Sequence, residues 1–315
     1  MTKRRLKNVG ASVRARLLAR SRETGEDFQT LLWRYAVERF LFRLGRSPYR
    51  GSFVLKGAML FVLWDEPFHR PTQDIDLAAQ GTAGPDDVVP ALQHVCRVAA
   101  AADGVVFGAD HMTVSRIRGA TEDGGIRIRF PATVDVARVI VQVDVGFGDS
   151  IQPPPADAEF PPLLGNATSR VLAYPKEVVV SEKLSAAIAH GEQTSRYKDF
   201  FDLYFMARRF QFEGVRLMQA FAATFDGRRS PTEDIPLPLT TAFYAETARG
   251  ERWRAYLTKR GRLRAPTDFT TVGELLQLFL TTPWRALSSG DPFAAEWLPG
   301  GPWQPGGPPR SIDDG

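Results

Sequence analysis

Hydrophobic residues recur at helical spacing near the start of the chain and again in its last third, whereas they alternate with polar residues in the middle. In the second helical pattern, for example, Phe28, Leu31, Tyr35 and Phe40 are among the apolar residues that recur at helical spacing. The helical spacing predicts helices over residues 11–22, 26–45, 57–64, 85–101, 175–190, 197–210, 213–225, 237–259 and 272–288.

The alternating stretches predict strands between these helices. Strands are expected over residues 52–55, 74–79, 104–108, 112–118, 125–131 and 138–146, with a turn at residues 133–137. Prolines at 153–155 and 161–162 indicate a linker. Residues 290–315 are rich in Gly and Pro and are expected to be disordered, although Trp297 and Trp303 could dock on the body of the protein.

These elements predict an α+β fold with N-terminal helices, a small core built on a mixed sheet, and a C-terminal helical domain. The expected divisions are a basic helical segment (1–50), the core (51–150), the helical domain (151–290) and a Pro/Gly-rich tail (291–315). Such a layout hosts many functions, so the function has to be argued from a site.

The composition is that of a globular protein, with 43% hydrophobic residues and no apolar run of the roughly 20 residues that a membrane span needs. No apolar signal core follows the basic start of the chain. We therefore expect a cytoplasmic protein that does not enter a membrane. Because the chain has one cysteine, Cys96, an internal disulfide and a thiolate zinc cluster are excluded. Cys96 lies in an apolar helical pattern, which predicts that it is a buried small hydrophobe.

Basic residues are concentrated in residues 1–50, which contain 13 Lys or Arg and 4 Asp or Glu and so carry a net charge of +9. The rest of the chain is therefore net −5, since the total is +4. A basic segment on a mildly acidic body indicates a polyanionic partner such as nucleic acid. The alternative is a solvated helical face, and charge alone does not decide between the two.

The stretch that says most about chemistry runs from Asp74 to Leu77, in an expected strand. Residues two apart on a strand project from the same face, so Asp74 and Asp76 would point together while Ile75 and Leu77 anchor the opposite face. Two convergent carboxylates are costly unless a cation lies between them, and Mg²⁺ (or Mn²⁺) prefers carboxylate oxygens together with water and substrate phosphate. By itself the triplet also fits a strand with two solvent-facing acids.

A third carboxylate is expected from Asp144. In the alternating run from Val141 to Val145, Asp144 shares a face with Gln142 and Gly146. Three carboxylates on adjacent strands would suit a two-metal site, whose ions lie roughly 3.5–4 Å apart.

Lys56 and Gly57 lie at an expected turn from strand to helix. A glycine there lets backbone N–H groups approach a phosphate, and the start of a helix favours an anion. The pattern is not a Walker loop, because the required glycines and the Lys-Ser/Thr pair are missing. By itself, Gly57 more often marks only a tight turn.

Together these motifs resemble those of the AbiEii and MenT-type nucleotidyltransferase toxins, which are distant relatives of the polymerase-beta-like nucleotidyltransferases. The resemblance covers about residues 50–210, in the same order and with similar spacing. The combination is specific, whereas no single part is. The matching stretches are Leu55-Lys56-Gly57-Ala58-Met59-Leu60, Arg70-x-Thr72-x-Asp74-Ile75-Asp76-Leu77, Val179-Val180-Ser181-Glu182-Lys183 and Arg196-Tyr197-Lys198-Asp199-Phe200-Phe201-Asp202.

The resemblance implies magnesium-dependent transfer of a nucleoside monophosphate from an NTP to an acceptor. It further implies that the acceptor is the 3′ end of tRNA and that the protein is the toxin of a toxin–antitoxin pair, with an antitoxin as a partner. The implied catalytic residues are Asp74, Asp76, Lys183 and Asp202. The implied nucleotide-binding residues are Lys56, Gly57, Arg70, Thr72, Arg196 and Asp199. The implied metal ligands are Asp74 and Asp76, to which the alternation of residues 141–145 adds Asp144.

Several of these residues keep a structural alternative. Lys183 could reach a triphosphate as a point charge or serve as the partner of an acid such as Asp202. Arg196, Asp199 and Asp202 are three apart, so one helix face presents all of them. The two acids could orient Lys183, contact the nucleotide or activate the acceptor, while Arg196 and Asp199 could form only an intrahelical pair. Another pair of residues, Arg70 and Thr72, could contact phosphate or shape the loop.

The sequence also departs from the family pattern. Ala58 stands where a second glycine or serine is usual, and the gap from Gly57 to Asp74 is long by the standard of the wider superfamily. Two other functions stay open: a non-catalytic module that binds RNA or a partner and keeps a relic site, and a metal-dependent nuclease that uses the same acids.

Overall fold

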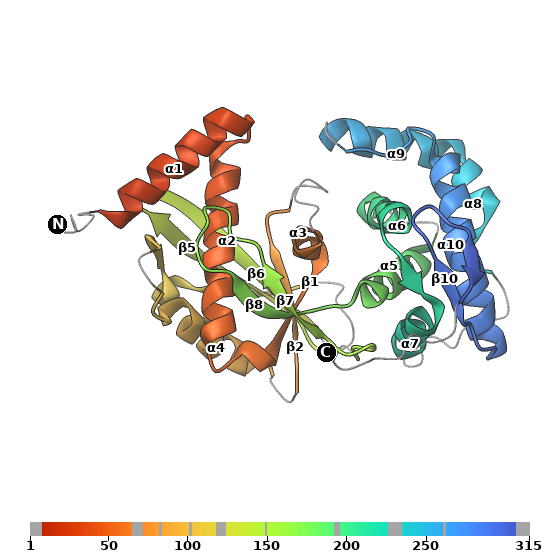
Figure 1. The fold of residues 1–315 in the computed structure, drawn as a ribbon, viewed down its shortest axis with the longest axis horizontal. Helices are drawn as coiled ribbons and strands as arrows, with labels where there is room; N and C mark the ends of the chain where they lie inside the picture. The colour runs from red at the N-terminus through yellow and green to blue at the C-terminus, as the bar shows by residue number, and fades with distance from the viewer. Residues whose placement is uncertain are drawn as a thin grey trace. The chain divides into compact units, whose positions relative to one another are not determined.

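The computed structural model describes residues 8–64, 72–81, 84–100, 103–117, 124–148, 150–191, 196–225, 235–260 and 263–306. The chain divides into two compact units (Figure 1). The first unit comprises Met1–Asp149 and Pro155–Tyr174, and the second comprises Ser150–Pro154 and Pro175–Gly315.

A mixed sheet organises the first unit. Within the described residues it has eight strands, in the order β3-β5-β6-β2-β1-β8-β7, with β4 paired to β5. The strands are β1 (Phe53–Lys56), β2 (Ile75–Ala79), β3 (Val105–Phe107), β4 (Thr113–Arg116), β5 (Gly125–Val134), β6 (Ala137–Gly146), β7 (Ala156–Phe160) and β8 (Ser169–Ala173). β2 is parallel to β6 and β1 is parallel to β8, whereas the other pairs are antiparallel. The predicted α+β fold with a mixed sheet is confirmed.

The two faces of this sheet differ in burial. Along β6, Val141, Val143 and Val145 are fully buried, while Gln142 and Asp144 between them are only partly buried. The buried face packs against helices, and the face with Gln142 and Asp144 is called the open face below. The helices of this unit are α1 (Val9–Thr24), α2 (Phe28–Arg46), α3 (Leu60–Leu63) and α4 (Pro85–Arg97), with 3₁₀ turns η1 (Arg50–Ser52), η2 (Gly57–Met59) and η3 (Ala109–His111).

Helix α2 forms the centre of the helical layer and packs against β6 and β8 (Figure 1). The Asp27 side chain caps its start by accepting a hydrogen bond from the Thr30 N–H. The ring of Phe40 packs against Phe107 and Phe130, with centroids 6.1 and 5.5 Å away. α1 and α4 also contact β5, so the apolar face of the sheet is covered.

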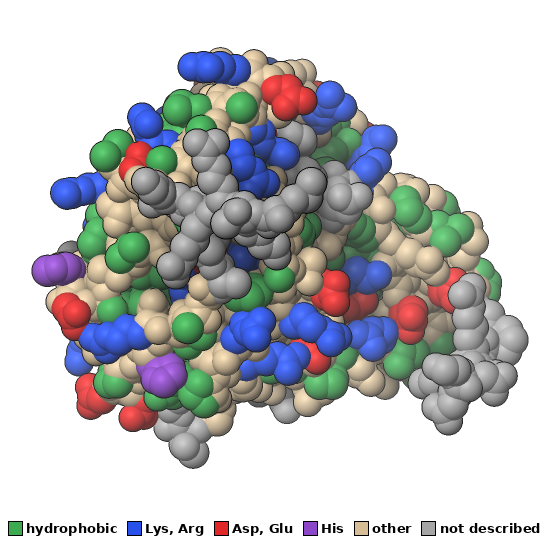
Figure 2. Space-filling view, turned by 60° about the vertical axis from the view of Figure 1, so that its left-hand side comes forward, with side chains coloured by type: hydrophobic (Ala, Val, Ile, Leu, Met, Phe, Trp, Pro, Cys, Tyr) green, Lys and Arg blue, Asp and Glu red, His purple; other side chains and the backbone are tan. Residues whose placement is uncertain are grey.

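Part of the N-terminal positive charge is used inside the fold. Arg39 pairs with Glu38 at 2.6 Å, and Arg43 pairs with Asp103 at 2.9 Å, with all four side chains buried. Burial raises the pKa of Glu38, although the Leu163 N–H and Arg39 oppose this effect. Arg39 and Arg43 therefore stabilise the packing of α2 rather than forming an outer surface. Elsewhere, Lys and Arg side chains are spread over the surface drawn in Figure 2, with Asp and Glu side chains among them.

Cys96 on α4 is buried, as predicted. Burial raises the pKa of its thiol to about 12, so the thiol stays protonated near neutral pH. Cys96 is therefore part of the apolar core and does not act as a nucleophile.

Two stretches that the sequence predicted to be irregular contain strands. The expected linker between the proline clusters holds β7, and β8 follows it, pairs in parallel with β1 and extends the sheet. In the predicted disordered tail, residues 295–297 and 303–305 form β10 and β11, and Trp297 is fully buried with its Nε1–H donating to the Ala207 carbonyl at 2.7 Å. The prediction of disorder is therefore wrong for residues 290–306, and the alternative, docking of Trp297 and Trp303, holds because aromatic packing outweighs the local Gly/Pro content.

The second unit is mainly helical. Its helices are α5 (Lys176–His190), α6 (Tyr197–Arg209), α7 (Gly214–Phe225), α8 (Thr241–Ala245), α9 (Thr247–Arg260) and α10 (Phe269–Ser289), with a 3₁₀ turn η5 (Leu237–Leu239) and the short strands β9 (Phe212–Glu213), β10 (Ala295–Trp297) and β11 (Trp303–Pro305). α10 contacts α6, α7, α8 and α9 and so forms the centre of this unit. The single helix predicted over 237–259 is instead three separate elements, η5, α8 and α9, because the chain leaves helical geometry at Thr240 and Glu246. None of the helices described is long and apolar enough to cross a membrane.

Candidate active site

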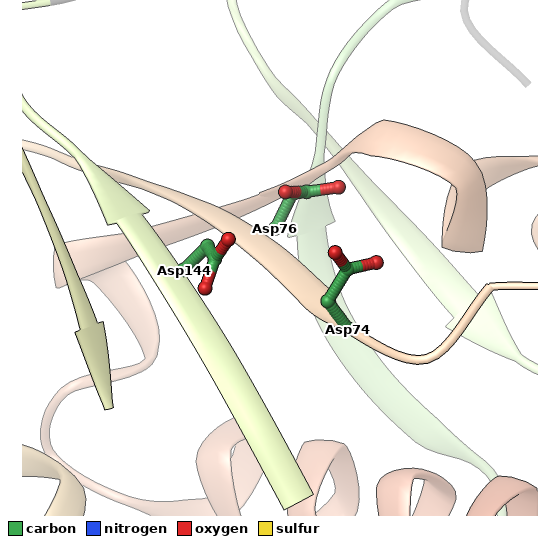
Figure 3. A group of neighbouring side chains, drawn as sticks. All are labelled: Asp74, Asp76 and Asp144. Atoms are coloured by element: carbon green, nitrogen blue, oxygen red, sulfur yellow. The ribbon is translucent and has the colours of Figure 1, made fainter. Parts of the chain in front are cut away.

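Three carboxylates converge on the open face of the sheet. Asp74, Asp76 and Asp144 each offer one oxygen, and these oxygens lie within 4.8 Å of one another. Figure 3 shows the three side chains pointing toward one another, with Asp76 on β2, Asp74 just before it and Asp144 on β6. All three side chains are partly buried, so the site is reachable from solvent.

The sheet register produces this convergence. β2 and β6 are parallel neighbours, and Asp76 lies directly beside Asp144. Asp74 precedes Asp76 by two residues and therefore projects to the same side. The Thr72 hydroxyl donates a hydrogen bond to Asp74 Oδ1 at 2.6 Å, which fixes that carboxylate just before the strand begins.

A guanidinium that the motifs did not single out lies beside the acids. Arg127 on β5 is paired in register with Asp144 and donates two hydrogen bonds, from Nε to Oδ1 at 2.9 Å and from Nη2 to Oδ2 at 2.6 Å. The hydrogen bond to Asp144 raises the pKa of Arg127, and the charges of Asp144, Asp74 and Asp76 add to this against the effect of burial.

The feature of the sequence that could have identified Arg127 is the register of the β5–β6 hairpin. β5 and β6 are joined by a two-residue turn at Asp135 and Val136, and counting back from it places Arg127 opposite Asp144. The turn was expected as a longer segment over residues 133–137, which left the register undefined.

Gly57 is required where the chain turns beside Asp76. Lys56, at the end of β1, pairs in register with Asp76, and its Nζ lies 5.6 Å from the centroid of the Tyr174 ring. Gly57 follows with φ +71°, and a Cβ built on it would lie 1.9 Å from Asp76 Oδ2. The glycine therefore supplies both a left-handed backbone conformation and the space that the carboxylate occupies.

We expect Gly57→Ala to lower both activity and stability. The added methyl group must displace the Asp76 carboxylate, and alanine at positive φ costs about 1–2 kcal/mol. Thermal unfolding and the initial rate of the transfer reaction that the motif resemblance implies measure the two effects. Gly51→Ala in the same unit is the control, since no atom lies within 4 Å of a Cβ at position 51. Equal rates for the two variants would show that the space beside Asp76 does not matter.

The residues present suit a divalent cation. Carboxylate oxygens are the ligands that Mg²⁺ prefers, and because each bond is about 2.1 Å, oxygens on one ion lie up to about 4.2 Å apart. The observed spread of at most 4.8 Å requires only small side-chain rotations. The absence of a Cβ at Gly57 leaves the space in which the Asp76 carboxylate lies.

A second charged cluster lies in the second unit. Lys183 on α5 contacts Asp199 Oδ1 at 2.9 Å and Asp202 Oδ2 at 2.5 Å, both on α6. Asp202 is fully buried and Asp199 is nearly so, whereas the Lys183 side chain retains 12% of its exposure. Arg196 adds a contact from Nε to Asp199 Oδ2 at 2.8 Å.

The electrostatics of this cluster favour the charged forms. Burial alone would raise the pKa of Asp199, but the charges of Lys183 and Arg196 outweigh it and hold the pKa below its ordinary value. Lys183 is thus fixed by two buried carboxylates, and only its exposed fraction can meet a ligand. The structure brings together Lys183, Arg196, Asp199 and Asp202 in one unit and the three metal-ligand candidates with Thr72, Lys56 and Gly57 in the other. Arg70 lies outside the described residues.

Known proteins show what this chain is similar to. Residues 39–275 match the model of the family described as nucleotidyl transferase AbiEii toxin, Type IV TA system. Two solved structures are similar: a candidate nucleotidyltransferase from Helicobacter pylori, with 14% identity, 85% of this chain and 100% of that chain covered and a TM-score of 0.47, and JHP933 from Helicobacter pylori, with 14% identity, 83% and 94% covered and a TM-score of 0.46. No curated protein matches the chain.

Proposed function

The chain belongs to the AbiEii family of nucleotidyltransferase toxins of type IV toxin–antitoxin systems, and we propose that it moves a nucleoside monophosphate from an NTP to the 3′ end of tRNA in the cytoplasm. Within a toxin–antitoxin pair, its protein partner would be the cognate antitoxin. The observation that carries the proposal is the convergence of Asp74, Asp76 and Asp144 on the open face of the sheet, beside Gly57.

We assign Asp74, Asp76 and Asp144 as the residues that would hold Mg²⁺ (or Mn²⁺). A metal held there would supply a lower pKa for an attacking hydroxyl and a positive charge opposite the triphosphate. Thr72 holds Asp74 in place through its hydrogen bond, so its proposed role is to position that ligand. Catalysis of this kind consists of positioning and electrostatic stabilisation.

Lys183 is proposed to bind the triphosphate as a point charge. Asp202 is fully buried and contacts the Lys183 ammonium at 2.5 Å, so we assign it as a positioning residue rather than one that touches substrate. Asp199 has the same role, while Arg196, whose side chain is 41% exposed, is proposed to contact phosphate, and the same role is proposed for Arg70, which lies outside the described residues.

The proposed acceptor is RNA, and the open face of the sheet offers cations for it. Arg138 on β6 and Arg129 on β5 lie on the same face as Asp144 and are exposed. Neither forms an ion pair with any described residue, and Arg129 donates to the Gln142 side chain at 2.8 Å. Arginines without acid partners can bind phosphates, and their binding weakens as salt rises.

We expect Arg138→Gln to weaken RNA binding and to reduce the slope of log K against log salt by about one unit, because one phosphate contact is lost. Arg116→Gln is the matched control: Arg116 is also exposed, but it pairs with Ile126 and so lies on the other face. Filter binding over a range of salt concentrations measures both variants. Equal slopes for Arg138→Gln and Arg116→Gln would exclude the open face as the RNA surface.

The proposed reaction is tested by supplying each α-labelled NTP in turn with Mg²⁺ and total RNA and resolving the products on a sequencing gel. Label in a tRNA-sized band is the expected result, and it names the base transferred. Shortened RNA without label would instead identify a metal-dependent nuclease. Intact, unlabelled RNA that the protein still binds would identify a binding module with a relic site.

A further inference from the structure

Arg127 already occupies the carboxylate that is proposed as the third metal ligand. Both oxygens of Asp144 accept a charge-assisted hydrogen bond from this one guanidinium. A divalent cation at the same carboxylate would therefore either break one of these bonds or lie directly beside a positive charge. In both cases Arg127 opposes metal binding at Asp144.

The three acids also explain why a cation belongs there. Asp74, Asp76 and Asp144 converge, and like charges at such separations are unfavourable without a counter-charge. Arg127 is placed by its register opposite Asp144 to supply that charge.

The Arg127 guanidinium can move away from the Asp144 carboxylate. The Arg127 side chain is 35% exposed, whereas that of Asp144 is 12% exposed, so the arginine approaches the acid from the solvent side. Rotation of its side chain releases the pair without any change in the β5–β6 pairing. A planar guanidinium also matches phosphate oxygens with two parallel hydrogen bonds, as it does a carboxylate.

From this geometry we propose that Arg127 is an exchangeable counter-cation, bound to Asp144 until a divalent metal takes that carboxylate, and then transferred to the phosphates of the nucleotide. The proposal rests on the proposed function, since it requires a metal and a nucleotide at these acids. It assigns a role to a residue that lies outside the motifs described above.

Arg129 provides a matched control. It lies two residues along β5 on the same face and is likewise an arginine, but it donates to the amide oxygen of Gln142 and contacts no carboxylate among the described residues. Arg129→Gln therefore removes an equal charge from the same surface and leaves both hydrogen bonds from Arg127 to Asp144 in place. Gln142, which Arg129 contacts, also donates to Asp144 Oδ1, at 3.3 Å, and keeps this donor in the variant.

The test uses Mn²⁺ as the metal probe and measures free Mn²⁺ by electron paramagnetic resonance with the full chain. We expect Arg127→Gln to tighten Mn²⁺ binding on the order of tenfold, because it removes a charge-assisted pair that competes for Asp144. The Mn²⁺ affinity of Arg129→Gln should stay within about twofold of that of the original protein. Arg127→Lys keeps the charge but lacks the two parallel donors of the guanidinium, so its Mn²⁺ affinity should lie between those of the original protein and Arg127→Gln. In the Asp144→Asn background the effect of Arg127→Gln should disappear.

The second arm uses inorganic triphosphate and saturating Mn²⁺ in a calorimetric titration. Arg127→Gln should weaken triphosphate binding on the order of tenfold, the opposite direction to its effect on the metal. Unchanged or weaker Mn²⁺ binding in Arg127→Gln, with a native thermal transition, would show that Arg127 only orients Asp144 and would overturn the proposal. Unchanged triphosphate binding would overturn the transfer to phosphate. If instead neither the original protein nor Asp76→Asn binds Mn²⁺, the metal site of the proposed function itself fails.

Discussion

Asp74→Asn and Asp76→Asn are each expected to lower the rate of nucleotidyl transfer by about a thousandfold or more while leaving the fold intact. The substitutions keep the size of the side chains but remove a metal ligand, and the charge stabilisation that a metal gives a phosphoryl transition state is worth several kcal/mol. A loss of about 4 kcal/mol corresponds to about a thousandfold in rate.

The same two substitutions are expected to leave the stability of the fold unchanged or to raise it slightly. Asp74, Asp76 and Asp144 lie within 4.8 Å of one another, so removing one charge relieves repulsion. We expect each variant to unfold at the same temperature as the original protein or a few degrees higher. Asp157→Asn is the control, since Asp157 is an exposed acid on β7 that pairs with Arg50, away from the cluster in sequence and register. Full activity in either cluster variant would refute the metal assignment.

The second large effect is expected at Lys183. Lys183→Met leaves Asp199 and Asp202 buried without their main counter-charge, and breaking a buried pair in this way costs about 3–5 kcal/mol of the free energy of unfolding. The same variant should lose transfer activity by about two to three orders of magnitude, because the proposed triphosphate contact is gone.

A triple variant separates the two roles of this lysine. In Lys183→Met/Asp199→Asn/Asp202→Asn no charge of the three remains buried, so most of the stability should return while activity stays lost. Urea unfolding and the labelling assay measure the two properties on the same samples. Recovery of activity together with stability would make the cluster purely structural.

The pH dependence of stability follows from Asp199. Its pKa in the folded state is held below the ordinary value of 3.8 by Lys183 and Arg196 against the effect of burial. A depressed carboxylate contributes stability that is present above the unfolded pKa and is lost as the pH falls through the folded pKa. The original protein should therefore lose stability below about pH 4, and Lys183→Met should lose much of this dependence. Urea midpoints over that range show whether it does.

Regular spacing of apolar residues made several strands and helices predictable. Alternation along β6 follows directly from facing a core on one side, whereas α2 shows helical spacing although nearly all of its residues from Leu31 to Leu44 are buried. β8 was missed because its neighbour β1 lies more than a hundred residues earlier, so its pairing is set by tertiary contacts rather than local pattern. Trp297 was assigned to a disordered tail since nothing local shows the carbonyl of Ala207 that its indole N–H reaches.

In the candidate site, too, some residues were predictable from local pattern and others depended on register or tertiary packing. Asp74, Asp76 and Asp144 could be placed on one face because residues two apart on a strand share a face, and the structure puts their strands side by side. Arg127 depended on the exact register of the β5–β6 hairpin, which a turn of uncertain length does not give. The burial of Asp202, which makes it a positioning residue, depends on how α5 and α6 pack and has no local signature.

We propose that the chain transfers the α-phosphoryl group of an NTP, with its nucleoside, to an acceptor through the three-carboxylate site. The most direct measurement follows α-labelled and γ-labelled forms of the same NTP in parallel with Mg²⁺, RNA and either the original protein or Asp76→Asn. With the original protein we expect α label to enter RNA and γ label to leave as pyrophosphate, and with Asp76→Asn we expect neither. Entry of γ label into the acceptor, or α label incorporated equally by Asp76→Asn, would contradict it.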